Sequence, residues 1–157
     1  SLQNLVNALD WEKISNGIPT NFHGDFHFEN IIFDKEKDSF IFIDWRQDFA
    51  GDIYFGDIYY DLAKIMHGII VSHDLINQNH FSVNWLNNCI NFQLHRTQNL
   101  VDCEKFFVNW LAENEYSVDK VYKITALIYL NIAALHHNPY SLMLYSLGKF
   151  MLNQYKD

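Results

Sequence analysis

The chain has 157 residues, the length of one domain, and its composition excludes two broad classes of protein. Hydrophobic residues make up 49% of it and charged residues only 19%, which is typical of a chain that buries a core and argues against disorder. The net charge is -8, and the 11 Lys and Arg form no basic run, so no nucleic acid is expected as a partner. A small neutral or cationic substrate fits this charge better.

The apolar segments do not indicate a membrane protein. Each long one is interrupted by Lys, Asn or Asp, and no signal peptide is visible, so we expect a cytoplasmic protein that binds no membrane. Cys89 and Cys103 lack the CxxC spacing of a metal site. We interpret them as ordinary buried thiols on two separate helices.

The first elements in chain order are a helix and a hairpin. Residues 1–14 carry apolar side chains at near-helical spacing and are followed by Gly17 and Pro19, which predicts one short amphipathic helix. Residues 30–34 and 40–44 are rich in β-branched and aromatic side chains and flank the polar loop KEKDS. This pattern predicts a two-stranded hairpin.

The rest of the chain predicts only helices. Asp102 and Ser117 are candidate N-caps, because their side-chain oxygens can accept hydrogen bonds from free backbone N–H groups, and Pro139 suits a first helical turn. The sequence therefore predicts a single mainly α unit of the α+β class with one small hairpin. Its later helices are expected at about residues 57–72, 81–96, 102–115, 117–136 and 139–155.

Polar residues border the open end of the predicted hairpin. Asp25 and Asn30 precede its first strand, and Asp44 ends its second strand. Because a hairpin brings its two open ends together, we expect Asn30 and Asp44 to lie side by side, with Asp25 just outside. Two carboxylates and a carboxamide offer the oxygen ligands that Mg²⁺ prefers. The sequence thus predicts a magnesium site at which one carboxylate can be spared for proton transfer.

Three motifs around this hairpin resemble the aminoglycoside phosphotransferase and choline kinase superfamily, whose members are relatives of the protein kinases. The motifs are HGDFHFEN at 23–30, FIDW at 42–45 and GDIYYDLAKI at 56–65, in the order that the family has. The resemblance implies the helical C-terminal lobe of a kinase-like fold, in which the hairpin carries the catalytic and metal-binding loops. It also implies transfer of the γ-phosphoryl group of ATP to an alcohol, with Mg²⁺ as cofactor.

The same resemblance implies a role for each motif residue. Asp25 would accept the proton of the substrate hydroxyl, and Asn30 and Asp44 would hold the metal ions that bridge the nucleotide phosphates. Four other residues would brace the catalytic loop, namely His23, Gly24, Asp57 and Asp61. Asp57 and Asp61 could instead cap the following helix.

The acceptor is less well defined by the sequence. Arg46 follows the IDW motif, and this feature is similar to family members associated with bacterial surface-polysaccharide and nucleotide-sugar pathways. The similarity favours a sugar hydroxyl as the acceptor, and an amino alcohol such as choline is the next candidate. Ring faces attract cations, so aromatic residues could cage a quaternary ammonium, although burial in a core is the more common fate of such residues. The residues concerned are Trp45, Tyr54, Tyr59, Tyr60 and Trp85.

A kinase of this kind needs a preceding strand-rich lobe with a glycine-rich loop and a phosphate-binding Lys, whereas residues 1–22 predict only a helix. We therefore interpret residues 1–157 as one C-terminal lobe, with the N-terminal nucleotide-binding lobe outside this chain. That lobe and a small-molecule alcohol are the expected partners. Alone, the chain is expected to be inactive and to self-associate through exposed apolar surface.

Two alternatives remain open. The chain could be a non-catalytic binding module that keeps the fold without turnover. The adjacent His73 and Asp74 are also similar to ligands of the His-Asp metal phosphohydrolases, although the sequence shows no convincing set of further ligands.

Overall fold

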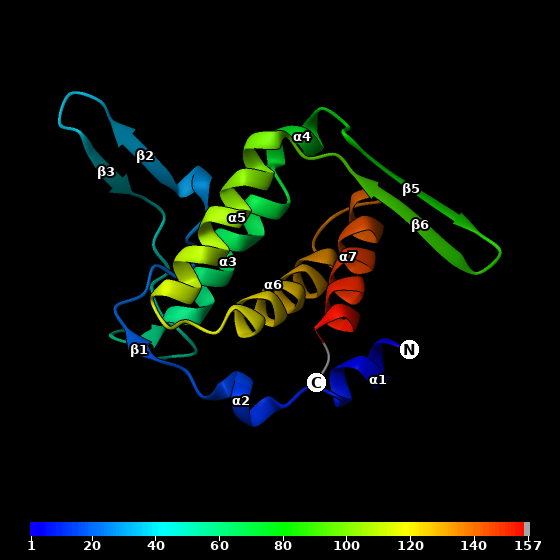
Figure 1. Ribbon diagram of the computed structural model, residues 1–157, viewed down its shortest axis with the longest axis horizontal. Coiled ribbons are helices and arrows are strands. Elements are labelled where there is room, and N and C mark those ends of the chain that lie inside the picture. Colours follow the sequence, from blue (N-terminus) through cyan, green and yellow to red (C-terminus); the bar gives the residue numbers. More distant parts are fainter. Residues whose placement is uncertain (156–157) are drawn as a thin grey trace.

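The computed structural model describes residues 1–155, and the predicted mainly α fold class with small antiparallel hairpins is confirmed (Figure 1). The short β1 and β4 pair with each other, as do β2 with β3 and β5 with β6. The elements are α1 Leu2–Asn7, α2 Trp11–Ser15, β1 Pro19–Thr20, the 3-10 helix η1 Phe28–Asn30, β2 Ile31–Asp34, β3 Ser39–Phe42, β4 Gly56–Asp57, α3 Ile58–Ile70, α4 His73–Asn77, β5 Phe81–Leu86, β6 Cys89–Leu94, α5 Gln98–Glu113, α6 Val118–Ala133 and α7 Tyr140–Gln154.

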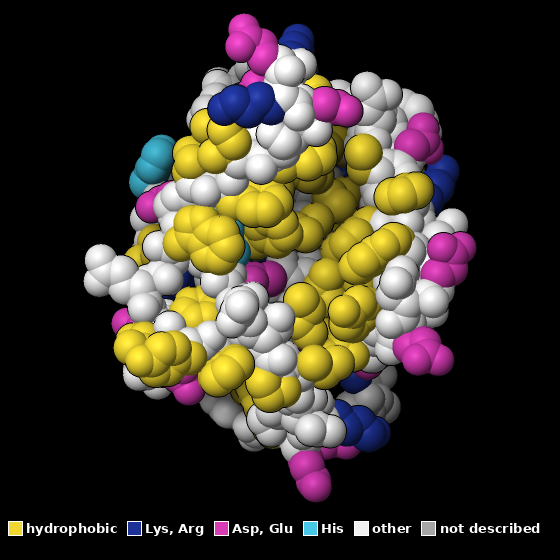
Figure 2. All heavy atoms as spheres, turned by 90° about the vertical axis from the view of Figure 1, so that its left-hand side faces the viewer, with side chains coloured by type: hydrophobic (Ala, Val, Ile, Leu, Met, Phe, Trp, Pro, Cys, Tyr) yellow, Lys and Arg dark blue, Asp and Glu magenta, His cyan; other side chains and the backbone are white. Residues whose placement is uncertain are grey.

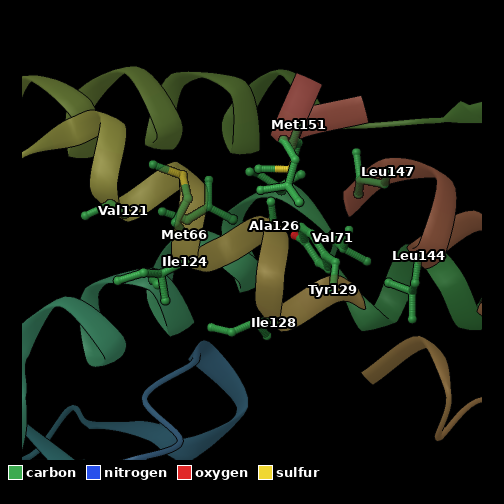
Figure 3. Close-up of a cluster of buried hydrophobic side chains, with 14 of the residues drawn as sticks. Met66, Val71, Val121, Ile124, Ala126, Ile128, Tyr129, Leu144, Leu147 and Met151 are labelled. Atoms are coloured by element: carbon green, nitrogen blue, oxygen red, sulfur yellow. The ribbon is translucent and has the colours of Figure 1, made fainter. Parts of the chain in front are cut away.

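The hydrophobic core lies where α6 packs between α3 and α7 (Figure 3). On α6, Val121, Ile124, Ile128 and Tyr129 follow the three-to-four residue spacing of one helix face, and all are buried. Gly148 allows α7 to approach closely, because a Cβ at this position would lie 2.8 Å from the backbone oxygen of Ala126. The core thus fixes α3, the helix on which the loop that carries Asp25 rests.

Two side chains of α6 also bond directly to the backbone of α3. The Thr125 hydroxyl lies 3.2 Å from the carbonyl oxygen of Ala63, and the Tyr129 hydroxyl donates a 2.8 Å hydrogen bond to that of His67. Since buried polar groups are costly when they lack a partner, these bonds specify how α6 lies along α3.

The prediction of a single helix over residues 1–14 is wrong. Two short helices, α1 and α2, occupy this segment, and Asp10 lies between them as the N-cap of α2. Its carboxylate accepts a 3.1 Å hydrogen bond from the backbone N–H of Lys13. A short acid in the middle of an apolar pattern therefore starts a new helix here.

The predicted helix over residues 81–96 is also wrong, because this segment forms the β5–β6 hairpin. Phe81, Val83 and Trp85 alternate with polar residues, the two-residue period of a strand. Asn87 and Asn88 form the turn with φ values of 50° and 60°, a conformation that Asn tolerates well in tight hairpins.

Three smaller predictions also differ from the structure. Helix α5 begins at Gln98 with Thr97 as its N-cap, so Asp102 lies inside the helix, whereas the predicted N-cap Ser117 is confirmed. The predicted helix 57–72 ends at Ile70, and α4 follows as a separate short helix. The prediction of buried thiols is wrong, since both cysteines are exposed, Cys89 on β6 and Cys103 on α5.

None of the helices within residues 1–155 has both the length and the apolar character that a membrane span requires.

A histidine is buried in the core without a hydrogen-bond partner for its ring. His67 on α3 is 3% exposed, and no group among the described residues bonds to either ring nitrogen. Its ring packs against that of Tyr129 with 5.0 Å between centroids. Burial, and then the nearby charge of Lys64, lower the pKa of His67 to about 3, so the ring is neutral at neutral pH.

We expect His67 to make the fold acid-sensitive. Its pKa is lower in the folded chain than the ordinary value of about 6.5, so the unfolded chain binds more protons between these values and stability falls as the pH drops through this window. Acidification from pH 7 to pH 4 should lower the free energy of unfolding of both proteins. The loss should be smaller in His67→Phe than in the parent, by up to roughly 3 kcal/mol. Urea denaturation at several pH values measures this difference. His80→Gln, at an exposed histidine, is the control, and equal acid losses in parent and His67→Phe would contradict the expectation.

Candidate active site

The loop that carries Asp25 is anchored to the first turn of α3. Asp61 is only 6% exposed. Its carboxylate accepts hydrogen bonds of 2.7 Å and 2.8 Å from the backbone N–H groups of His23 and Gly24. Asp57 is the N-cap of α3, accepting from the N–H of Tyr59 and from that of Ile18. Both acids therefore connect the start of α3 to the segment that leads into the loop.

The loop is also held from the side of the hairpin. The backbone N–H of Arg46 donates a 2.9 Å hydrogen bond to the carbonyl oxygen of His23, whose ring stacks on that of Trp45 at 4.8 Å. Gly24 has a φ of +79°, and a Cβ there would lie 2.7 Å from the Cβ of Arg46. Gly24 is thus required both by the backbone conformation and by the close approach of the two segments.

Asp25 lies between two basic groups. Its Oδ1 is 2.6 Å from Nζ of Lys64, which is 7% exposed on α3, and its Oδ2 is 3.5 Å from Nε2 of His27. The hydrogen bond with His27, and then the contact with Lys64, hold the pKa of Asp25 well below its usual range, although burial opposes them. At neutral pH, Asp25 is therefore a fixed carboxylate that can accept a hydrogen bond from a hydroxyl group.

The polar contacts continue away from Asp25 toward α4. Nδ1 of His27 lies 2.5 Å from one oxygen of Glu29, and the other oxygen of Glu29 lies 3.2 Å from Nδ1 of His73. The hydrogen bond with Asp25 is the main cause that raises the pKa of His27, and Glu29 adds to it against the effect of burial. The loop is thus linked to α4 by side chains.

Sequence reasoning missed Lys64, His27 and Glu29 as parts of this site. The signal for Lys64 was present, because it follows Asp61 by three residues and so shares its face of α3. His27 and Glu29 lie within the HGDFHFEN motif, but only the fold shows which atoms they contact.

Asn30 lies at the open end of the β2–β3 hairpin, as predicted, but the residue opposite it on the second strand differs by one position from the prediction. Ile43 rather than Asp44 lies opposite Asn30, and its N–H donates a 3.0 Å hydrogen bond to the Asn30 carbonyl oxygen. Asp44 follows with a φ of 58° as the chain leaves the hairpin. The Nδ2 group of Asn30, which is 8% exposed, donates a 2.9 Å hydrogen bond to the backbone oxygen of Asp25.

Comparison with protein-family models gives one match to this region. Residues 2–82, slightly more than half of the chain, match the model named APH, which is described as the phosphotransferase enzyme family. The chain belongs to this family. The match includes the Asp25 loop, the β2–β3 hairpin and α3, and it confirms the resemblance inferred from the motifs. No curated protein and no solved structure matches the chain.

The oxygen donors at the hairpin fit the Mg²⁺ ion that phosphotransferases of this family use. The amide nitrogen of Asn30 is held by Asp25, which leaves its Oδ1 for a cation, and within residues 1–155 no group pairs with the exposed Asp44 carboxylate. No three His, Cys, Asp or Glu side chains of the described chain gather as a metal site. Two protein oxygens form the kind of partial set that Mg²⁺ completes with water and phosphate oxygens.

The residues of the phosphohydrolase alternative lie on α4. His73 contacts Glu29, and the part of the chain that the structure describes brings no group of further acids or histidines around His73 and Asp74. Phosphohydrolase chemistry at this place therefore has no support beyond the two adjacent residues.

The aromatic residues considered for a cation cage do not converge. Tyr59 is buried in the core, but core burial is the wrong prediction for Trp45, Tyr54 and Trp85, which are all exposed. Trp45 follows β3 and Trp85 lies in β5, and these hairpins extend from opposite sides of the molecule (Figure 1). The five residues therefore do not form one aromatic cage.

Proposed function

We propose that the chain is the C-terminal lobe of an ATP-dependent small-molecule kinase that phosphorylates a hydroxyl group of a sugar or an amino alcohol. The observation that carries the proposal is the ionised Asp25 carboxylate, held by Lys64 and His27 next to Asn30. The family match supports phosphoryl transfer as the class of reaction. The motif around Arg46 favours a place in bacterial surface-polysaccharide or nucleotide-sugar metabolism, and use of ATP favours a cytoplasmic location.

In this reaction Asp25 accepts the proton of the acceptor hydroxyl. The hydroxyl oxygen forms a bond to the γ-phosphorus, the bond from that phosphorus to the bridging oxygen breaks, and ADP leaves. Lys64 and His27 position the carboxylate, since they contact its two oxygens. Asn30 and Asp44 hold Mg²⁺, which neutralises charge on the phosphates when bound.

The exposed surface supports a second lobe as partner. On the side of the molecule that bears the β2–β3 hairpin, apolar side chains gather around a hollow (Figure 2). Such a surface is rarely left uncovered in a soluble protein. We propose that the nucleotide-binding lobe of the complete protein covers it; in the absence of that lobe, self-association is expected. The exposed apolar residues of this region include Ile32, Phe33, Phe40, Ile41, Phe42, Ile43, Trp45, Ile53, Tyr54 and Phe55.

The metal ligands supply a direct test in the complete protein. Asp44→Ala should weaken Mg-ATP binding and lower turnover together, and Asn30→Ala should do so less, because a neutral carboxamide attracts a dication less than a carboxylate does. Calorimetry with Mg-ATP and an assay of ADP formation across sugars, choline and aminoglycosides measure both effects. Glu36→Ala, an exposed acid in the loop of the same hairpin, is the matched control.

Two results would count against the proposal. Unchanged Mg-ATP affinity in Asp44→Ala would remove Asp44 from the metal site. Tight nucleotide binding without ADP formation for any acceptor would favour the non-catalytic binding module.

A further inference from the structure

A pocket of about 400 Å³ lies beside the catalytic loop, within the range of about 300–1,000 Å³ typical of small-molecule sites. Its wall includes residues of α4, the first residue of β5 and the connection between α6 and α7. The residues that matter here are His73, Asn77, Asn79, Phe81, His136 and His137.

The pocket is joined to Asp25 through side-chain contacts. His73, one of its lining residues, contacts Glu29, which contacts His27, which in turn contacts Asp25. The rings of His73 and His27 are only 6.1 Å apart. A molecule in the pocket would therefore lie next to the loop that holds the proton acceptor.

The lining of the pocket is polar but carries no fixed charge. Imidazole and carboxamide groups provide donors and acceptors, and no Asp, Glu, Lys or Arg among the described residues lines it. Partial desolvation lowers the pKa of His136, so this ring is neutral at neutral pH. Glu29 is not a lining residue, and its two oxygens are taken by His27 and His73.

Aromatic rings complete the wall. Phe81 and Tyr140 both line the pocket with 5.9 Å between their centroids, and the ring of His136 lies 4.7 Å from that of Tyr140. The Tyr140 hydroxyl is buried, and no group in residues 1–155 bonds to it. Apolar ring surface beside neutral hydrogen-bonding groups suits a ligand that has both C–H and O–H groups.

We propose that this pocket binds the phosphoryl acceptor and that the acceptor is an uncharged polyhydroxylated compound of the sugar class. The inference rests on the proposed kinase function and narrows its choice of acceptors. A quaternary ammonium or an aminoglycoside requires carboxylates, or aromatic rings on several sides, to replace its hydration. The described lining has no carboxylate, and only Phe81 and Tyr140 contribute phenyl or phenol rings to it. Hydroxyl groups, in contrast, can donate hydrogen bonds to the imidazole and carboxamide groups of the lining and accept hydrogen bonds from them.

The test uses the complete protein and reads binding separately from transfer. Histidine ring signals are recorded by NMR during titration with glucose, galactose and N-acetylglucosamine, and with choline and kanamycin as cationic probes. We expect at least one sugar to shift the signals of His73 and His136 in a saturable manner, and neither cation to do so.

Two exposed pocket residues allow the site to be weakened without disturbing the core. His136→Ala and Asn77→Ala should each lower the affinity for that sugar about tenfold and leave the affinity for Mg-ATP unchanged. A tenfold loss corresponds to one lost hydrogen bond at the upper end of the usual range of its free-energy contribution. His95→Ala, an exposed histidine outside the pocket, is the matched control and should change neither affinity.

The possible results separate the two proposals. Cation-induced shifts, or no shift with any of the sugars, would overturn the inference. Phosphorylation of a sugar with parental affinity in both pocket variants would place the acceptor elsewhere and leave the kinase proposal intact. Sugar binding with the expected variant effects but without ADP formation would support the pocket and reject the kinase proposal.

Discussion

Replacing Asp25 with Asn in the complete protein is expected to lower kcat by about 10²-fold or more, the usual contribution of a positioned general base. The carboxamide keeps the shape of the side chain but cannot accept the proton of the acceptor hydroxyl. Because Asp25 is not expected to bind the metal or the nucleotide, the affinity for Mg-ATP should change little. Steady-state ADP formation and calorimetry with Mg-ATP measure the two quantities.

Asp48→Asn is the matched control for this substitution. Asp48 is exposed in the segment after β3 and accepts a hydrogen bond from the backbone N–H of Gly51, which Asn can also accept. Its variant should keep the parental rate. If Asp25→Asn kept that rate as well, the role assigned to Asp25 would be wrong and the motif would describe the fold alone.

The second large effect is expected at Asp61, which holds the loop that carries Asp25 against α3. Asp61→Ala leaves two buried N–H groups, those of His23 and Gly24, without an acceptor. Since each unsatisfied buried donor costs about 1–3 kcal/mol, the free energy of unfolding should fall by roughly 3 kcal/mol. The kcat should fall too, because Asp25 loses its fixed position. Urea denaturation and the assay of ADP formation measure both changes.

Asp61→Asn separates the loss of the hydrogen bonds from the loss of charge. Its remaining carbonyl oxygen can accept one of the two bonds, so its stability should lie between those of the parent and Asp61→Ala. Asp102→Ala removes an exposed acid on α5 and should stay near the parental stability. A stable Asp61→Ala variant would show that the loop is held mainly by its other contacts.

The sequence by itself determined the elements whose signals are local. The β-branched and aromatic runs on either side of KEKDS indicate the β2–β3 hairpin, and the apolar spacing of residues 118–133 indicates α6. Ser117 is identifiable as a cap because capping involves only its own turn. The family, too, follows from short motifs within residues 23–65.

Some errors came from ambiguous local patterns. Residues 81–94 contain both strand alternation and enough apolar residues to suggest a helix, and the turn at Asn87 and Asn88 decides between them. The exposure of Trp45 and Trp85 could not be read from residue type, since aromatic residues are usually buried unless the fold leaves them on a free surface.

The environment of Asp25 was decided only by the tertiary structure. Lys64 lies 39 positions further along the chain, and it reaches Asp25 because Asp61 fixes the loop to α3 and the core fixes α3 to α6. The histidine-lined pocket likewise joins α4 to the α6–α7 connection. No local pattern encodes such distances, because they depend on how amphipathic helices bury their apolar faces against one another.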